Sequence, residues 1–125
     1  MKLVDSSGWL EFFLGGPLAD AYASHLKDPH QLVTPTVVLY EVYKVIKRER
    51  NEEEALMAAG QMGKTHLVPM TDVVALTAAD ASLARGLAMA DAIVFATALI
   101  EKAKLITSDA DLGELPEVLY LKKSN

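Results

Sequence analysis

The 125-residue sequence contains no cysteine. Disulfide bridges, thiolate metal ligands and cysteine nucleophiles are therefore excluded, and a cysteine-free chain suits the reducing cytoplasm, where we expect this protein. Histidine is scarce: His25, His30 and His66 are scattered without ligand spacing, so we interpret them as surface residues. The sequence thus offers carboxylates and hydroxyls, and few other groups, for chemistry.

Secretory and membrane-spanning segments are also missing. The apolar stretch after Lys2 is too short for the core of a signal peptide. The segment GLAMADAIVFATALI, residues 86–100, falls short of the roughly 18 residues of a membrane span and carries Asp91 inside it. We therefore expect no membrane contact, and we interpret 86–100 as a central helix covered by protein on most sides.

Two familiar catalytic motifs are absent. Gly63-Lys64-Thr65 suggests a phosphate-binding loop, but that motif requires glycine where the chain has Ala58, and the segment precedes a strand rather than following one. No G-x-S-x-G sequence occurs, so a serine hydrolase has no support.

The charge balance is acidic, with a formal net charge of −5. This charge disfavours a protein that binds nucleic acid only through contacts of lysine and arginine with the phosphates. It permits one that meets phosphates through bound metal ions, because the acids that hold such ions are counted in the negative total. With 51% hydrophobic residues, the chain is predicted to form one domain, residues 1–125, with a substantial core.

Short apolar strands alternate with helices along the chain. Strands are predicted at 2–5, 31–33, 65–68, 104–107 and 118–121. Helices are predicted at 9–14, 18–27, 35–50, 51–62, 72–87 and 90–102, with Ser6 or Ser7, Thr34, Asn51 and Thr71 as N-caps. This pattern predicts an α/β fold, a three-layer α/β/α arrangement with a short parallel sheet of four to five strands. Ligands of such folds bind outside the carboxyl ends of the strands.

Two acids lie at that edge of the predicted sheet. Asp5 ends the first strand, and Asp109 follows the fourth, with Asp111 two residues later. Aspartate is also common in turns and caps, so this alternative stays open for each residue taken alone.

Two further acids lie within apolar helices. Glu41 falls in a stripe with Val38, Val42 and other apolar residues at helical spacing, where a carboxylate is costly unless it is paired or holds a metal. Asp91 shares a helix face with Val94 and Phe95. The alternatives are a Glu at the stripe margin that reaches solvent and an Asp that offsets the helix dipole.

No lysine or arginine lies within two residues of any of these four acids. If the four converge, their mutual repulsion requires neutralisation, for which a divalent cation is the natural candidate. Oxygen ligands without histidine or cysteine suit Mg²⁺ or Mn²⁺ rather than Zn²⁺.

Four stretches carry a family resemblance: VDSSGWLEFF, TPTVVLYEVYKVI, GLAMADAIVFATA and LITSDADLGELP. They occur in the order seen in PIN-domain ribonucleases, and the sequence resembles that family over almost its whole length, most closely the toxin branch called VapC. The resemblance implies a metal site of Asp5, Glu41, Asp91 and Asp109, with Asp111 as an accessory ligand and Ser6 and Thr107 as hydroxyls beside it. Leu112 departs from the family, which usually has an aromatic residue there; we expect this to affect packing rather than chemistry.

The resemblance also implies an activity and partners. The expected activity is Mg²⁺- or Mn²⁺-dependent hydrolysis of RNA phosphodiester bonds, which leaves a 3′-hydroxyl and a 5′-phosphate. Asp5, Glu41 and Asp91 would hold one ion, and Asp109, with Asp111, a second ion or a bridging water; the number of ions stays open. The expected partners are RNA, a cognate antitoxin protein and a second copy of the chain in a homodimer.

Three alternatives remain at this level. They are a PIN nuclease with a housekeeping role in RNA maturation or decay, a catalytically inactive PIN-fold binding module, and a phosphoacceptor domain. The last would need a second acid beside Asp5, where Ser6 and Ser7 stand instead.

Two surface features also have two interpretations. The cations Lys44, Lys47, Arg48 and Arg50 form either a solvated helix end or a contact to RNA or an acidic partner. The apolar side chains of residues 9–13 are expected to be mostly core, with part available for a partner.

Overall fold

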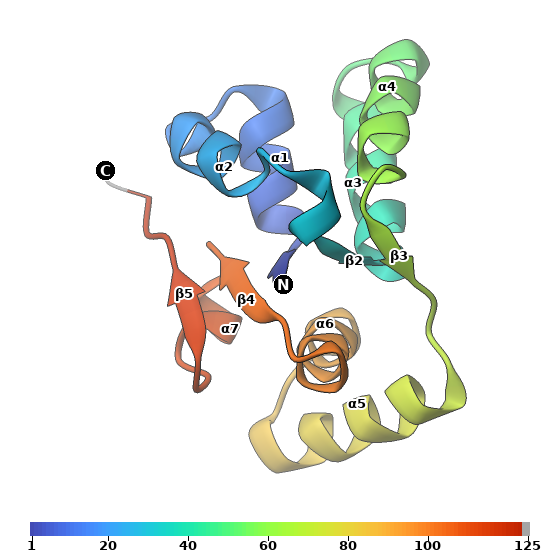
Figure 1. Cartoon of the computed structure of the whole chain (residues 1–125), viewed down its shortest axis with the longest axis vertical. Coiled ribbons are helices and arrows are strands. Elements are labelled where there is room, and N and C mark those ends of the chain that lie inside the picture. Colours follow the sequence, from blue (N-terminus) through green and yellow to red (C-terminus); the bar gives the residue numbers. More distant parts are fainter. Residues whose placement is uncertain (124–125) are drawn as a thin grey trace.

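The structure is a computed structural model that describes residues 1–123, and its strands lie between two groups of helices (Figure 1). On one side lie α1 (Ser6–Leu14), α2 (Ala19–His25), α3 (Thr36–Glu49) and α4 (Glu52–Met62). On the other lie α5 (Asp72–Arg85) and α6 (Met89–Glu101), while the short α7 (Ala110–Gly113) packs beside the last strand. The predicted three-layer α/β/α arrangement is confirmed.

Five strands form in the predicted order and every pairing between them is parallel, but the second begins at Val33 rather than at residue 31, because Pro29–Gln31 form a 3₁₀ helix. They are β1 (Lys2–Val4), β2 (Val33–Pro35), β3 (His66–Val68), β4 (Lys104–Thr107) and β5 (Val118–Tyr120). The hydrogen-bonded ladders are split, however, into a three-stranded sheet β1-β4-β5 and a two-stranded sheet β2-β3. A single bridge between Lys2 and Leu32 joins them, so the expected continuous sheet of four to five strands is interrupted between β1 and β2.

The strand order creates a reversal beside β1. The chain passes from β1 to β2 and β3 on one side, and then places β4 and β5 on the other side of β1. Parallel sheets bind ligands at such a switch point, outside the carboxyl ends of the two strands. The register sets Val4 opposite Ile106, so the residues that follow β1 and β4 come together there.

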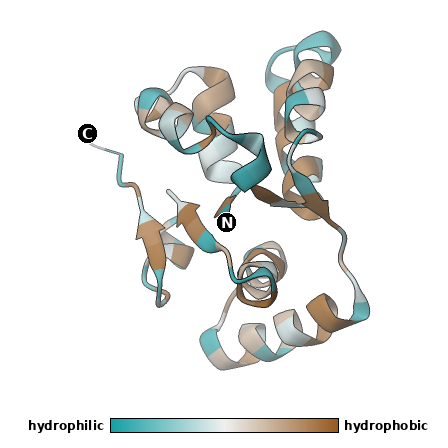
Figure 2. Ribbon diagram, viewed as in Figure 1, coloured by the Kyte–Doolittle hydropathy of each residue, from teal (hydrophilic) through white to brown (hydrophobic). Residues whose placement is uncertain are grey.

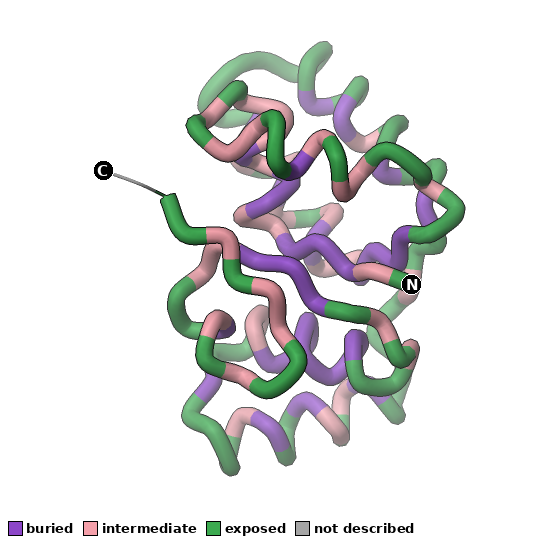
Figure 3. Tube along the Cα trace, turned by 60° about the vertical axis from the view of Figure 1, so that its left-hand side comes forward, coloured by how far each residue is buried: buried purple, intermediate pink, exposed green. Residues whose placement is uncertain are grey.

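The core surrounds these strands and α6. Leu3, Val4, Leu105 and Ile106 are at most 2% exposed, and burial follows the centre of the chain trace in Figure 3. Apolar residues colour the same strands in Figure 2. Residues 92–98 of α6 are all buried, which confirms a central helix within the predicted range 86–100, although residues 86–88 lie outside it.

No single helix within residues 1–123 is long and apolar enough to cross a membrane. Helices α5 and α6 reach the required length and composition only as a pair bent by 116°.

The predicted helix starts are correct in part. Asn51 caps α4, with its Oδ1 accepting from the Glu54 N–H at 2.8 Å, and Thr71 caps α5. The Ser6 or Ser7 cap of α1 is wrong, because the Asp5 carboxylate accepts from the Gly8 N–H instead.

The predicted Thr34 cap of α3 is also wrong. Thr34 and Pro35 belong to β2, and the helix begins at Thr36 without a side-chain cap. The Thr34 hydroxyl is buried and forms a hydrogen bond with the Thr65 hydroxyl at 2.7 Å. The side chain that was expected to cap α3 therefore bonds a residue that is distant in the sequence.

Candidate metal centre

The two acids predicted at the sheet edge lie at the switch point between β1 and β4. Asp5 directly follows β1, and its N–H donates to the Ile106 carbonyl at 3.3 Å. Asp109 follows β4 by two residues and caps α7, accepting from the Asp111 N–H at 2.9 Å. Both residues are therefore caps, as the local alternative held, and both also face the same site.

Three carboxylates meet in a compact group. Each of Asp91, Asp109 and Asp111 offers an oxygen, and these atoms lie within 4.8 Å of one another. Asp91 comes from the first turn of α6, whereas the other two come from the start of α7. Burial raises the pKa of Asp91 to about 7, and repulsion by Asp109, Asp5 and Asp111 adds to the rise.

Asp5 is the most buried acid of the site, with only 3% of its surface exposed. Its carboxylate accepts from the hydroxyls of Thr107 at 2.6 Å and Ser7 at 2.7 Å and from the Gly8 N–H at 3.3 Å. Burial nevertheless raises the pKa of Asp5 to about 6, because desolvation outweighs these hydrogen bonds, and the Asp109 charge adds to the rise.

Glu41 reaches the same group from α3. It is half-buried, and burial raises its pKa, as does repulsion by Asp109. A hydrogen bond from the Ser6 side chain and the charge of Lys44 act in the opposite direction. The charge of Asp109 thus raises the pKa values of Asp5, Glu41 and Asp91, but the compact group consists of Asp91, Asp109 and Asp111, so a site shared by all four predicted acids stays a prediction.

The site carries negative charge that no ion pair balances within residues 1–123. Among residues 1–123, no lysine, arginine or histidine nitrogen forms an ion pair within 4.0 Å of any of the five acids. Carboxylates brought together in a partly desolvated place are unfavourable unless they bind protons or a cation. A site of carboxylate oxygens alone matches the ligand preference of Mg²⁺ and Mn²⁺.

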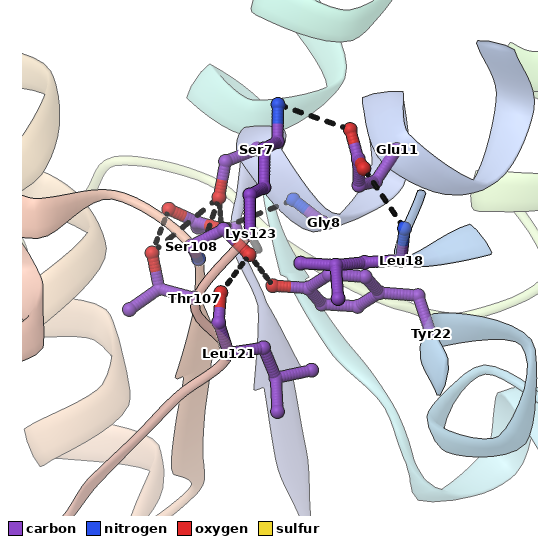
Figure 4. A network of polar contacts seen from close by, with 10 residues as sticks. Ser7, Gly8, Glu11, Leu18, Tyr22, Thr107, Ser108, Leu121 and Lys123 are labelled. Carbon is purple, nitrogen blue, oxygen red and sulfur yellow. Dashed lines mark hydrogen bonds and ion pairs between the residues drawn. The ribbon is translucent and has the colours of Figure 1, made fainter. Parts of the chain in front are cut away.

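The hydroxyls beside the site were predicted incompletely. Thr107 contacts Asp5, and Ser6 interacts with Glu41. Ser7 was missed as a site residue, although it donates to Asp5 and accepts from the Ser108 N–H (Figure 4). The signal was present as a hydroxyl two residues after the strand-end acid, a spacing at which side chains commonly bond.

The basic helix end is largely neutralised by neighbouring acids. Exposed ion pairs join Lys47 to Glu52 at 3.2 Å and Arg48 to Glu49 at 3.1 Å. A third pair joins residues 50 and 54 at 3.8 Å. This favours the interpretation of a solvated face over a phosphate-binding patch.

The remaining predictions concern packing. Trp9 is buried at 3% exposure and stacks on Phe13 with ring centroids 5.6 Å apart, in accordance with a core role. Leu112 is fully buried, so the departure from the family pattern affects packing. His30 and His66 are exposed as expected, whereas His25 is half-buried with its Nδ1 3.3 Å from the Lys2 Nζ.

Comparisons with known proteins identify the family and the fold. The family model of the PIN domain matches residues 2–118. The fold is similar to that of a chain in a toxin–antitoxin complex from Klebsiella pneumoniae, with a TM-score of 0.83 and 22% identity over 98% of this chain and 100% of that one. It is similar to VapC20 of Mycobacterium tuberculosis, titled a sarcin–ricin loop cleaving toxin, with a TM-score of 0.78 and 19% identity over 98% and 100% of the two chains.

A further structural neighbour was solved with DNA. It is VapBC2 from Rickettsia felis, bound to a fragment of its promoter, with a TM-score of 0.73 and 13% identity over 97% of each chain. A search of curated proteins finds no match.

Proposed function

Because this chain belongs to the PIN domain family, we propose that it is a divalent-metal-dependent endoribonuclease that acts as a VapC-type toxin. The observation that carries the proposal is the compact group of Asp91, Asp109 and Asp111, with Asp5 and Glu41 near enough to be affected by the Asp109 charge, and no ion pair within residues 1–123 balances these acids. These acids come from four separate segments, so no single local structural need explains their convergence.

Asp5, Glu41 and Asp91 would hold a Mg²⁺ or Mn²⁺ ion, and Asp109 with Asp111 would hold a second ion or an ordered water. A bound ion of this kind supplies an activated water and stabilises the charge that develops on the phosphate oxygens. The protein's own contribution is to hold the carboxylates in place: Thr107 and Ser7 orient Asp5, and Ser6 lowers the pKa of Glu41 and so favours its charged form. The acidic site repels RNA phosphates when no cation is present, so substrate would bind only to the loaded protein.

The partner in this proposal is a cognate antitoxin protein, in the cytoplasm. Support comes from the structural neighbours, which include toxin–antitoxin complexes. Exposed apolar side chains on α3 and α4, among them Tyr40, Leu56 and Met57, are compatible with a protein partner or a second copy.

The nuclease activity is tested by RNA cleavage with Mg²⁺, with and without EDTA. Asp5→Asn and Asp91→Asn are each expected to lower the rate by about 100-fold or more, because each removes a ligand of the ion. Asp80→Asn is the matched control, since Asp80 is exposed on α5 and lies outside the acidic group. Undiminished cleavage by either site variant would reject the proposed centre.

The toxin role is tested separately by expression in a bacterial host. We expect growth arrest with the native chain and normal growth with Asp5→Asn at equal protein level. A short reading frame immediately upstream, encoding a DNA-binding protein that relieves the arrest, would identify the antitoxin. Cleavage without growth arrest would favour a housekeeping nuclease.

A further inference from the structure

The Ser7 hydroxyl connects the two chain segments that carry Asp5 and Asp109. Its Oγ lies 2.7 Å from Asp5 Oδ1 and accepts from the Ser108 N–H at 2.9 Å (Figure 4). Ser7 belongs to the first turn of α1, and Ser108 precedes Asp109 at the end of β4. One side chain therefore joins segments 101 positions apart in the sequence.

The direction of each hydrogen bond is determined. The Ser108 N–H can only donate, so it takes a lone pair of Ser7 Oγ, and the single Ser7 proton is directed to Asp5. Thr107 is arranged in the same way: its Oγ1 accepts from the Asp109 N–H at 2.9 Å and donates to Asp5 Oδ2 at 2.6 Å. Two successive backbone N–H groups thus orient two hydroxyls, one for each oxygen of the Asp5 carboxylate.

These bonds use the capacity of the two carboxylate oxygens unequally. Oδ1 accepts from both the Ser7 hydroxyl and the Gly8 N–H, which fills its two lone-pair positions. Among residues 1–123, Oδ2 accepts from Thr107 alone, which leaves one of its lone-pair positions without a protein donor. Ser7 therefore bonds the more fully occupied oxygen, Oδ1, rather than Oδ2.

We propose that Ser7 is a positioning residue for the metal centre: it fixes the Asp5 carboxylate relative to Asp109 and directs Oδ2 to the ion. The proposal rests on the proposed function, since it assigns a role to Ser7 in the same site. Residues that orient metal ligands typically increase metal affinity or activity by about 10- to 100-fold.

Ser108 provides a matched control for the loss of a hydroxyl. Its Oγ donates to the Leu121 carbonyl at 2.6 Å and accepts from the Tyr22 hydroxyl at 2.7 Å. Ser7→Ala and Ser108→Ala thus each remove two short hydrogen bonds from a half-buried serine, and Ser7→Ala also removes a longer contact of 3.5 Å with the Thr107 hydroxyl. Only the first removes a bond to Asp5, because the Ser108 N–H that bonds Ser7 is backbone and is retained.

The experiment measures the Mn²⁺ dissociation constant of the full-length variants by calorimetry, with thermal unfolding recorded beside it. We expect Ser7→Ala to weaken Mn²⁺ binding by about 10-fold or more and Ser7→Thr, which keeps a hydroxyl, to restore most of the affinity. Ser108→Ala is expected to lower the unfolding temperature about as much as Ser7→Ala while binding Mn²⁺ like the native chain.

The outcomes separate this inference from the proposed function. A native chain that binds no Mn²⁺ would overturn the metal centre itself, and the positioning role with it. Native binding together with unchanged binding by Ser7→Ala would overturn the positioning role alone. Equal losses of affinity in Ser7→Ala and Ser108→Ala would also overturn it, because the effect would then come from general destabilisation.

Discussion

The Thr107 hydroxyl lies 2.6 Å from the Asp5 carboxylate, although the two residues are 102 positions apart in the sequence. The contact follows from the parallel register, in which Val4 lies opposite Ile106, so that the next residue of each strand reaches the same edge. A buried acid is thereby held beside the loop that carries Asp109. This one relationship brings Asp5, near the start of the chain, and Asp109, near its end, close to one another.

Replacing Asp91 is expected to raise the stability of the metal-free protein and to remove its stabilisation by Mn²⁺. Asp91→Asn removes a charge that is repelled by Asp109, Asp5 and Asp111, so the metal-free protein should gain about 1 kcal/mol, or about 4 °C in unfolding temperature. The same variant should lose the rise in unfolding temperature that Mn²⁺ produces in the native chain. Scanning calorimetry with EDTA and with Mn²⁺ measures both effects. Asp80→Asn is the control, and a metal-free Asp91→Asn protein less stable than native would contradict the repulsion.

The stability of the metal-free protein should fall as pH rises from 5 to 7.5. Burial raises the pKa of Asp5 from 3.8 to about 6 and that of Asp91 to about 7. In this window the folded state retains protons that the unfolded state has already lost, so unfolding releases protons and becomes easier as pH rises. Unfolding temperatures in EDTA across the window test this, and a flat or rising profile would speak against buried, mutually repelling acids. Asp91→Asn should reduce the slope.

Metal affinity should change with pH in the opposite sense. An ion that binds these carboxylates displaces their protons. The Mn²⁺ dissociation constant should therefore increase about tenfold for each pH unit below the pKa of a group that must lose its proton. The strongest change is expected between pH 7 and 5, where Asp91 and Asp5 gain protons. Calorimetric titrations at several pH values measure it, with proton release as an independent readout. Affinity that is constant across this range would exclude both residues as ligands.

Gly8 should be intolerant of a side chain, unlike another helical glycine. A Cβ at Gly8 would collide with the Tyr22 ring and with Val4 Cγ1, so Gly8→Ala should destabilise the protein by about 1–3 kcal/mol. Gly60 lies in α4 with no atom within 4 Å of such a Cβ, and Gly60→Ala should stabilise it by about 0.5–1 kcal/mol. Urea unfolding of the two variants provides the comparison. Similar effects in both would show that the close approach of α2 to α1 is not required.

Local sequence signals predicted most of the elements, because caps and apolar periodicity act within a few residues. Asn51 and Thr71 cap their helices as expected. The failures occurred where a distant partner competed for a polar side chain. Thr34 bonds Thr65 across the β2–β3 pair instead of capping α3, and Asp5 takes the cap position expected of Ser6 or Ser7.

The sequence indicated which acids are candidates for the site, but it did not show how close together they lie. An acid at a strand end and a glutamate in an apolar stripe are each unusual locally, and the order of motifs added the family resemblance. The sequence did not indicate that Ser7 belongs to the site, since a hydroxyl beside an aspartate is common. Its contact with the Ser108 N–H is set by the tertiary structure. The rises in the pKa values of Asp5 and Asp91 likewise depend on burial and on neighbours from other segments.

The amino-acid order alone determined the alternation of apolar strands and helices, the central helix 92–98, and which carboxylates lack a nearby lysine or arginine. These properties arise from residues close together in the chain. Tertiary structure decided the split of the strands into two ladders, the contact of Asp5 with Thr107, and the shared surroundings of Asp91 and Asp109. The physical reason is that strand register and helix packing, rather than sequence spacing, set the distance between groups about a hundred residues apart.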